Sequence, residues 1–202
     1  MEVGQVLSIV DALNLPLYTN DANSNCPSHL TSYLNSNNVF ELLLPWLSKR
    51  IFDAACVANT RQAWGFAMDI PHAVNPRVVE YHEMRQGGSL SSMSHCDIGS
   101  LVTVDLMLQE PSAIEPMWTA FGKQRGGGQF QTINNHAEIE TVEAFHPGDA
   151  LAFVSHKLHR VSPITGGGAR KVLVVEYWHG AHRLCGHRCE ARLPQHCSLS
   201  LC

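Results

Sequence analysis

The chain has 202 residues, of which 45% are hydrophobic and 16% charged, with a formal net charge of −4. This composition indicates one globular domain with a small appendage. The acidic balance provides no basic stripe for a nucleic-acid backbone, and the interrupted apolar runs are too short to cross a bilayer, so we expect neither nucleic acid nor membrane as a partner.

The first part of the chain, residues 1–78, is predicted to be a helical and loop region that packs on the core. Residues 1–17 lack the basic start and small-residue cleavage site of a signal peptide, which favours a cytoplasmic location. Residues 18–38 are rich in Asn and Ser and predict a loop with a short helical piece over 27–34. Apolar residues at helical spacing predict a helix within 39–57, and Pro45 favours a start near that residue.

The middle of the chain, residues 79–180, has the pattern of a β domain. Short segments that alternate polar and apolar residues or form apolar runs are separated by Gly- and Pro-rich stretches, which is typical of a sandwich or jelly roll. The predicted strands cover residues 77–84, 101–108, 129–132, 138–144, 151–154 and 171–178.

Two histidines and an aspartate in this region have the types and spacing of metal ligands. His95 and Asp97 are two residues apart, and on a β-strand such residues point to the same face. His159 follows an apolar run at 150–154 that predicts a buried strand. Two histidines and one carboxylate form the facial triad of non-haem Fe(II) sites, which leaves coordination positions open. We therefore predict a metal site at His95, Asp97 and His159.

Arg170 is the predicted partner for an anionic co-substrate. Residues 163–168 are rich in Gly and predict a turn between antiparallel strands, which can place His159 and Arg170 on neighbouring strands. A guanidinium inside an apolar barrel is costly unless a carboxylate binds it with both oxygens. A dicarboxylate co-substrate would supply that carboxylate.

Taken together, these features resemble the Fe(II)/2-oxoglutarate-dependent dioxygenases, in particular their prolyl 4-hydroxylase-like branch. The resemblance covers about half of the chain. The matching features, in chain order, are Tyr81, Gly88, His95-x-Asp97, Gly126-Gly127-Gly128-Gln129-Phe130, Pro147-Gly148-Asp149, His159-Arg160-Val161-Ser162-Pro163 and Arg170.

The resemblance implies a double-stranded β-helix with supporting helices, and an enzyme that hydroxylates a C–H bond with release of succinate and CO2. Its cofactors would be Fe(II), 2-oxoglutarate and O2, and it admits ascorbate as well. Arg170 would bind the far carboxylate of 2-oxoglutarate. Where members of the family have an Arg-x-Ser pattern, this chain has Val172, so Tyr81 or Thr103 is predicted to supply the second contact to that carboxylate.

Two other classes of function stay open at this point. A cupin-like metal enzyme would use the same β architecture without 2-oxoglutarate, but it would have no need for Arg170. A non-catalytic β-barrel binding module would lack the metal ligands. The expected substrate is either a peptide, which would be hydroxylated at a prolyl residue in the nearest family activity, or a small molecule. Residues 86–94 and 110–124 are the predicted rims of the substrate entrance. The sequence leaves the oligomeric state open.

The C-terminal tail, residues 181–202, is dense in Cys and His. Such density in a short segment indicates disulfides in an oxidising compartment, a zinc site in a reducing one, or free thiols in a disordered tail. The tail is predicted to lie over the outside of the barrel or near its mouth. The residues concerned are His182, Cys185, His187, Cys189, His196, Cys197 and Cys202.

Overall fold

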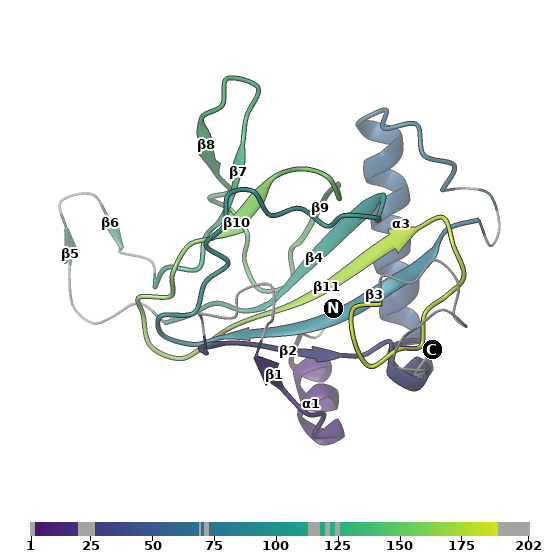
Figure 1. Ribbon diagram of the computed structural model, residues 1–202. Coiled ribbons are helices and arrows are strands. Elements are labelled where there is room, and N and C mark those ends of the chain that lie inside the picture. The colour runs from purple at the N-terminus through teal and green to yellow at the C-terminus, as the bar shows by residue number, and fades with distance from the viewer. Residues whose placement is uncertain are drawn as a thin grey trace.

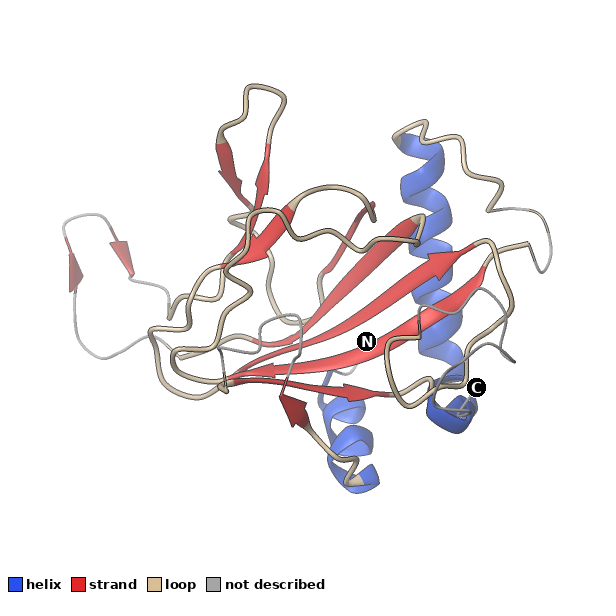
Figure 2. Ribbon diagram, viewed as in Figure 1, coloured by secondary structure: helices blue, strands red, loops and turns tan. Residues whose placement is uncertain are grey.

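The computed structural model describes residues 3–19, 27–68, 70, 73–112, 118–119, 122–123 and 126–189. Strands predominate in this part of the chain, and the longest helix lies behind the sheet (Figures 1 and 2). The helices are α1 (Val3–Leu13), the 3₁₀ helix η2 (Ser36–Asn38), α2 (Val39–Leu43) and α3 (Pro45–Arg61). The strands are β1 (Tyr18–Thr19), β2 (His29–Tyr33), β3 (Asn75–Met84), β4 (Val102–Gln109), β5 (Trp118–Thr119), β6 (Gly122–Lys123), β7 (Phe130–Ile133), β8 (Ile139–Thr141), β9 (Ala150–Val154), β10 (His159–Val161) and β11 (Arg170–Trp178).

Two antiparallel sheets form the core, as expected for a mainly β chain with supporting helices. The larger sheet has the strand order β1-β2-β3-β11-β4-β9, and the smaller one has the order β10-β7-β8. The smaller sheet stands beside one end of the larger one in Figure 1. The predicted strands of residues 79–180 are all present, although β8 is shorter than its predicted range.

The two faces of the larger sheet have different coverings. One face packs against α1 and α3, which contribute Val6, Val10, Leu47, Ile51 and Ala55 to the main hydrophobic cluster. The other face lines a cavity that the smaller sheet and the β3–β4 loop help to enclose. Because successive residues of a strand point to opposite faces, each long strand contributes alternately to the helix-covered core and to the cavity.

Two local predictions for residues 1–78 have different outcomes. The helix break is confirmed, because α2 ends at Leu43 and α3 begins at Pro45, where a missing backbone N–H costs nothing. The helical piece predicted over residues 27–34 is wrong, because His29–Tyr33 forms β2 and pairs with β3. The region before residue 79 therefore contributes strands as well as helices. None of the helices in the described ranges has the length and apolar content needed to cross a membrane.

Candidate active site

The segment that contains His95 and Asp97 is a loop and not a strand, contrary to the prediction. It runs between β3 and β4, and main-chain hydrogen bonds hold it beside β10. The His159 N–H donates to the His95 carbonyl at 3.0 Å, and the Asp97 N–H donates to the Ser155 carbonyl at 2.8 Å. The loop is therefore extended enough to present both side chains to the same cavity, which is why the spacing argument still located them.

The structure brings the three predicted metal ligands together. One ligand atom from each of His95, Asp97 and His159 lies within 4.8 Å of the others. The His95 Nε2 atom is 3.3 Å from Asp97 Oδ1, and the His159 Nε2 atom is 4.0 Å from Asp97 Oδ2. Asp97 and His159 are buried, and His95 is partly exposed.

The hydrogen bond that His159 makes leaves its other ring nitrogen available for a metal. His159 donates its Nδ1–H to the Lys157 carbonyl at 2.9 Å, so its Nε2 keeps the lone pair that faces Asp97. Burial lowers the pKa of His159, which favours the neutral ring that binds metals. The donor set therefore fits a divalent metal with two nitrogens and one carboxylate.

Thr103 acts on Asp97 rather than on a co-substrate. Its buried hydroxyl donates to Asp97 Oδ2 at 2.7 Å and lies 2.9 Å from the Ser155 hydroxyl. Burial opposes ionisation of Asp97, but the hydrogen bond from His95, the charge of His159 and the Thr103 hydroxyl hold the pKa of that carboxyl below its usual value. Thr103 thus fixes the orientation of a predicted metal ligand.

Arg170 lies in the same cavity as the triad, which has a volume of about 650 Å³. It begins β11 in the larger sheet, whereas His159 belongs to β10 in the smaller one, so the two residues face the cavity from different sheets and not from neighbouring strands. The Arg170 side chain is fully buried. Its Nε and Nη2 have no hydrogen-bond partner within the described ranges. Burial lowers the pKa of Arg170, and the nearby Asp105 carboxyl opposes that shift.

Tyr81 does not reach the cavity. It points to the helix-covered face of β3 and belongs to the main hydrophobic cluster. Its strand neighbours Glu80 and His82 occupy the cavity side instead. β3 is buried on both faces, so the alternation of residue types could not show which face was the cavity. The structure therefore provides no contact from Tyr81 to a ligand beside Arg170.

A chain of polar residues that the sequence reasoning missed crosses the cavity wall. His82 Nδ1 lies 2.9 Å from His29 Nε2, and His82 Nε2 lies 2.9 Å from Glu80 Oε2. Burial and the charge of His82 lower the pKa of His29 to about 3, so His29 is neutral. Burial opposes ionisation of Glu80, but the His82 hydrogen bond holds its pKa below the usual value. The sequence offered one sign of this chain of residues: Glu80 and His82 are two positions apart on a predicted strand, so they point to the same face.

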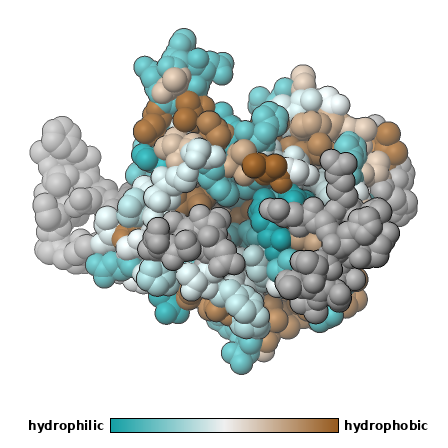
Figure 3. Space-filling view, viewed as in Figure 1, coloured by the Kyte–Doolittle hydropathy of each residue, from teal (hydrophilic) through white to brown (hydrophobic). Residues whose placement is uncertain are grey.

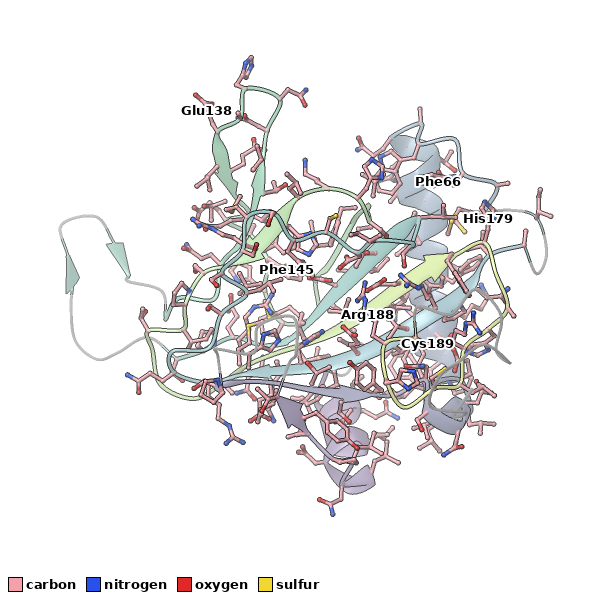
Figure 4. All side chains as sticks on the ribbon, viewed as in Figure 1. Phe66, Glu138, Phe145, His179, Arg188 and Cys189 are labelled. Atoms are coloured by element: carbon pink, nitrogen blue, oxygen red, sulfur yellow. The ribbon has the colours of Figure 1, made fainter. Side chains whose placement is uncertain are left out.

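The C-terminal segment reaches into the cavity through Arg188. Figure 4 shows Arg188 over the strands of the larger sheet, beside Cys189. Its guanidinium binds both oxygens of the buried Glu176, with one contact at 3.0 Å, and lies 3.9 Å from Asp97 Oδ1. Hydrophilic side chains gather at a hollow in this face (Figure 3). The tail is predicted to lie over the outside of the barrel or near its mouth; the structure describes residues 181–189 of it, and Arg188 in that part lines the cavity.

The two described cysteines of the tail and one of its two described histidines form a cluster. Cys185, His187 and Cys189 offer ligand atoms within 4.8 Å of one another, and both cysteines are buried. Cys185 is disulfide-bonded, a state in which its sulfur does not bind a metal. His196, Cys197 and Cys202 lie outside the described residues, as do residues 113–117, 120–121 and 124 of the predicted rim. Zinc in the tail stays a prediction.

Comparison with known proteins shows which class of fold this is. No family model matches the sequence, and no curated protein matches it. Among solved structures, a Trichoplax adhaerens prolyl hydroxylase in complex with a peptide fragment of the hypoxia inducible factor oxygen degradation domain has a TM-score of 0.58 at 16% identity, over 88% of this chain and 76% of that chain. The fold is therefore that of the 2-oxoglutarate and Fe(II) oxygenases, the jelly roll that the sequence predicted.

Two further solved structures support the same fold. A prolyl 4-hydroxylase from Pseudomonas putida has a TM-score of 0.53 at 15% identity, over 89% of this chain and 86% of that chain. HygX from Streptomyces hygroscopicus, solved with nickel and 2-oxoglutarate bound, has a TM-score of 0.55 at 12% identity, over 90% and 82% of the two chains. At these identities the likeness defines the fold, and the chemistry of this chain has to be argued from its own residues.

Proposed function

We propose that this chain is an Fe(II)- and 2-oxoglutarate-dependent oxygenase that hydroxylates a C–H bond. His95, Asp97 and His159 would hold the metal, because their ligand atoms converge and His159 presents its unprotonated nitrogen. Arg170 would bind the far carboxylate of 2-oxoglutarate. With O2, the iron and the co-substrate supply the oxidising power for hydroxylation, and succinate and CO2 are released.

The observation that carries this proposal is the state of Arg170. A fully buried guanidinium with two nitrogen positions lacking partners is costly in a protein that has no ligand for it. A carboxylate ligand satisfies such a group with two parallel hydrogen bonds. A cupin-like enzyme that uses no 2-oxoglutarate gives no reason for this arginine, so we favour the 2-oxoglutarate reading over that alternative.

The protein's own part in the reaction is to hold and orient the predicted metal ligands and to exclude water from the site. Thr103 keeps the Asp97 carboxylate in one orientation, and the Lys157 carbonyl fixes the His159 ring. Phe130 stacks on the His159 ring at 5.3 Å and Phe153 meets it edge-on at 5.0 Å. These aromatic side chains shield one side of the predicted metal site from water.

A peptide is the first substrate class to test. The solved prolyl hydroxylase with a bound peptide has the same fold, and we propose prolyl hydroxylation of a peptide as the nearest activity. The β3–β4 loop lines the cavity with Leu90, Cys96 and Ile98, and we propose it as one rim of the substrate entrance. Ascorbate is proposed only as an additive that sustains turnover.

The deciding experiment is an anaerobic titration of the Fe(II)-loaded protein with 2-oxoglutarate, followed by the visible charge-transfer band of a chelated keto acid. The wild type should develop the band, His159→Ala should not, and Arg170→Met should need far more 2-oxoglutarate. Arg160→Met is the matched control, since Arg160 lies on β10 and binds Gln131 outside the cavity. If iron binds and no band forms, the chain does not use 2-oxoglutarate.

A further inference from the structure

A second buried group on the cavity wall has no hydrogen-bond partner among the residues that the structure describes. Asp105 lies on β4 with its side chain towards the cavity, and only 6% of the residue is exposed. It makes no side-chain hydrogen bond to any residue in the described ranges. Its oxygens are not among the fully buried atoms that lack a partner, so they open onto the cavity, where a ligand group can reach them.

Asp105 and Arg170 share this cavity without binding each other. They lie on the adjacent strands β4 and β11, and each acts electrostatically on the other. Even so, no ion pair or hydrogen bond joins them, although both side chains are described. A carboxyl and a guanidinium that line one cavity without pairing leave room for a ligand group that contacts both of them.

The chemistry of Asp105 suits a carboxylate ligand. Burial raises the pKa of Asp105 to about 7, Arg170 opposes that rise, and the charges of Asp97 and Glu80 add to it. A protonated carboxyl is a hydrogen-bond donor, and its bond to a carboxylate oxygen is short and strong. A ligand carboxylate beside Asp105 would favour its protonated form further.

The residues that could replace the missing serine two positions after Arg170 do not contact its ligand. Val172 lines the cavity two residues along β11 and has no hydroxyl to donate. Thr103 is engaged with Asp97, and Tyr81 faces the helices. Val172 and the two residues predicted to replace its missing hydroxyl, Tyr81 and Thr103, therefore have no donor aimed at the ligand of Arg170.

We propose that Asp105, in its protonated form, donates the second hydrogen bond to the ligand carboxylate that Arg170 binds. This inference rests on the proposed function, because it takes that ligand to be the far carboxylate of 2-oxoglutarate. It makes binding of the co-substrate sensitive to pH near neutrality, because ionised Asp105 repels a carboxylate and cannot donate.

Other charged and titratable groups face Asp105 from the surrounding elements, so the experiment has to separate them. Arg170 faces the same cavity from β11, Glu80 and His82 from β3, His29 from β2, the predicted metal ligands from the β3–β4 loop and β10, and two residues from the C-terminal segment. The Arg, Glu, Asp and His residues that line the cavity together with Asp105 are His29, Glu80, His82, His95, Asp97, His159, Arg170, His187 and Arg188. Substitution of Asp105 alone isolates its share of any pH dependence.

The test is calorimetric titration of 2-oxoglutarate into the Mn(II)-loaded protein between pH 6 and 8.5, with metal occupancy checked by electron paramagnetic resonance at each pH. Wild-type affinity should fall about tenfold or more as the pH rises through 7, the scale of one hydrogen bond to a charged group. Asp105→Asn, whose amide donates at every pH, should lose this dependence and keep tight binding. Asp105→Leu should bind weakly throughout.

A ligand control separates the two carboxyl ends of the co-substrate. 2-Oxobutanoate has the same keto acid end and no far carboxylate, so its affinity should not differ between wild type and Asp105→Asn. If 2-oxoglutarate binds and Asp105→Asn has the wild-type pH dependence, the role of Asp105 is refuted while the proposed function stands. If the manganese-loaded protein binds no 2-oxoglutarate at any pH, both are refuted.

Discussion

Replacing Thr103 with valine is the sharpest test of how the predicted metal site is held. Valine has nearly the same shape as threonine, so the change removes the hydroxyl and little else. The hydroxyl donates to Asp97 Oδ2 at 2.7 Å, and the residue is fully buried, so no water can replace it. A hydrogen bond to a charged group contributes about 1.5–3 kcal/mol. At about 1.4 kcal/mol per factor of ten, Thr103→Val should weaken metal binding roughly tenfold to a hundredfold.

The assay is calorimetric titration with Mn(II), which binds such sites without redox chemistry. Thr31→Val is the matched control, because Thr31 is a buried strand threonine whose hydroxyl lies 3.1 Å from His82, which is not a predicted metal ligand. The control should keep wild-type Mn(II) affinity. Unchanged affinity in Thr103→Val, or an equal loss in Thr31→Val, would refute the role given to Thr103.

Two further predictions concern stability and are measured by urea unfolding. Arg188→Met should destabilise the fold by the lower end of the roughly 3–5 kcal/mol typical of broken buried ion pairs, because the arginine is partly exposed; adding Glu176→Gln should recover most of the loss, and a simple sum of the two effects would contradict the pairing. Gly127→Ala should destabilise strongly, since φ is +78° there and a Cβ would lie 2.1 Å from a carbonyl oxygen, whereas Gly167→Ala meets no atom within 4 Å and should be neutral.

The sequence pattern located the larger strands because their apolar residues are buried on at least one face. It failed at β2, where His29, Thr31 and Ser32 are all buried and polar, so no alternation marks the strand. Their burial is explained by partners on β3, such as His82 for His29 and Thr31, that only the folded chain provides. Local periodicity cannot report such pairing across distant segments.

The convergence of His95, Asp97 and His159 could be predicted because their residue types and spacing are local features of the sequence. Tyr81 was predicted to contact the ligand, but it points to the helices. Alternate residues of a strand point to opposite faces, and because β3 is buried on both faces, its residue types could not show which set enters the cavity. Arg188 could not be predicted at all. It reaches Glu176 and Asp97 only after the segment beyond β11 folds back over the sheet, and neither its type nor its spacing signals that return.

The main-chain hydrogen bonds that clamp the β3–β4 loop have a consequence for evolution. Leu90 and Val161 exchange two such bonds, and further bonds join His95 to His159 and Asp97 to Ser155. The positions of His95 and Asp97, two of the predicted ligands, are thereby set by backbone groups that every residue type except proline possesses. We expect that side chains between and beside them, such as Cys96 and the 77% exposed Ile98, can be exchanged without moving the predicted ligands. Selection could thus change what the cavity accepts while the chemistry stays in place.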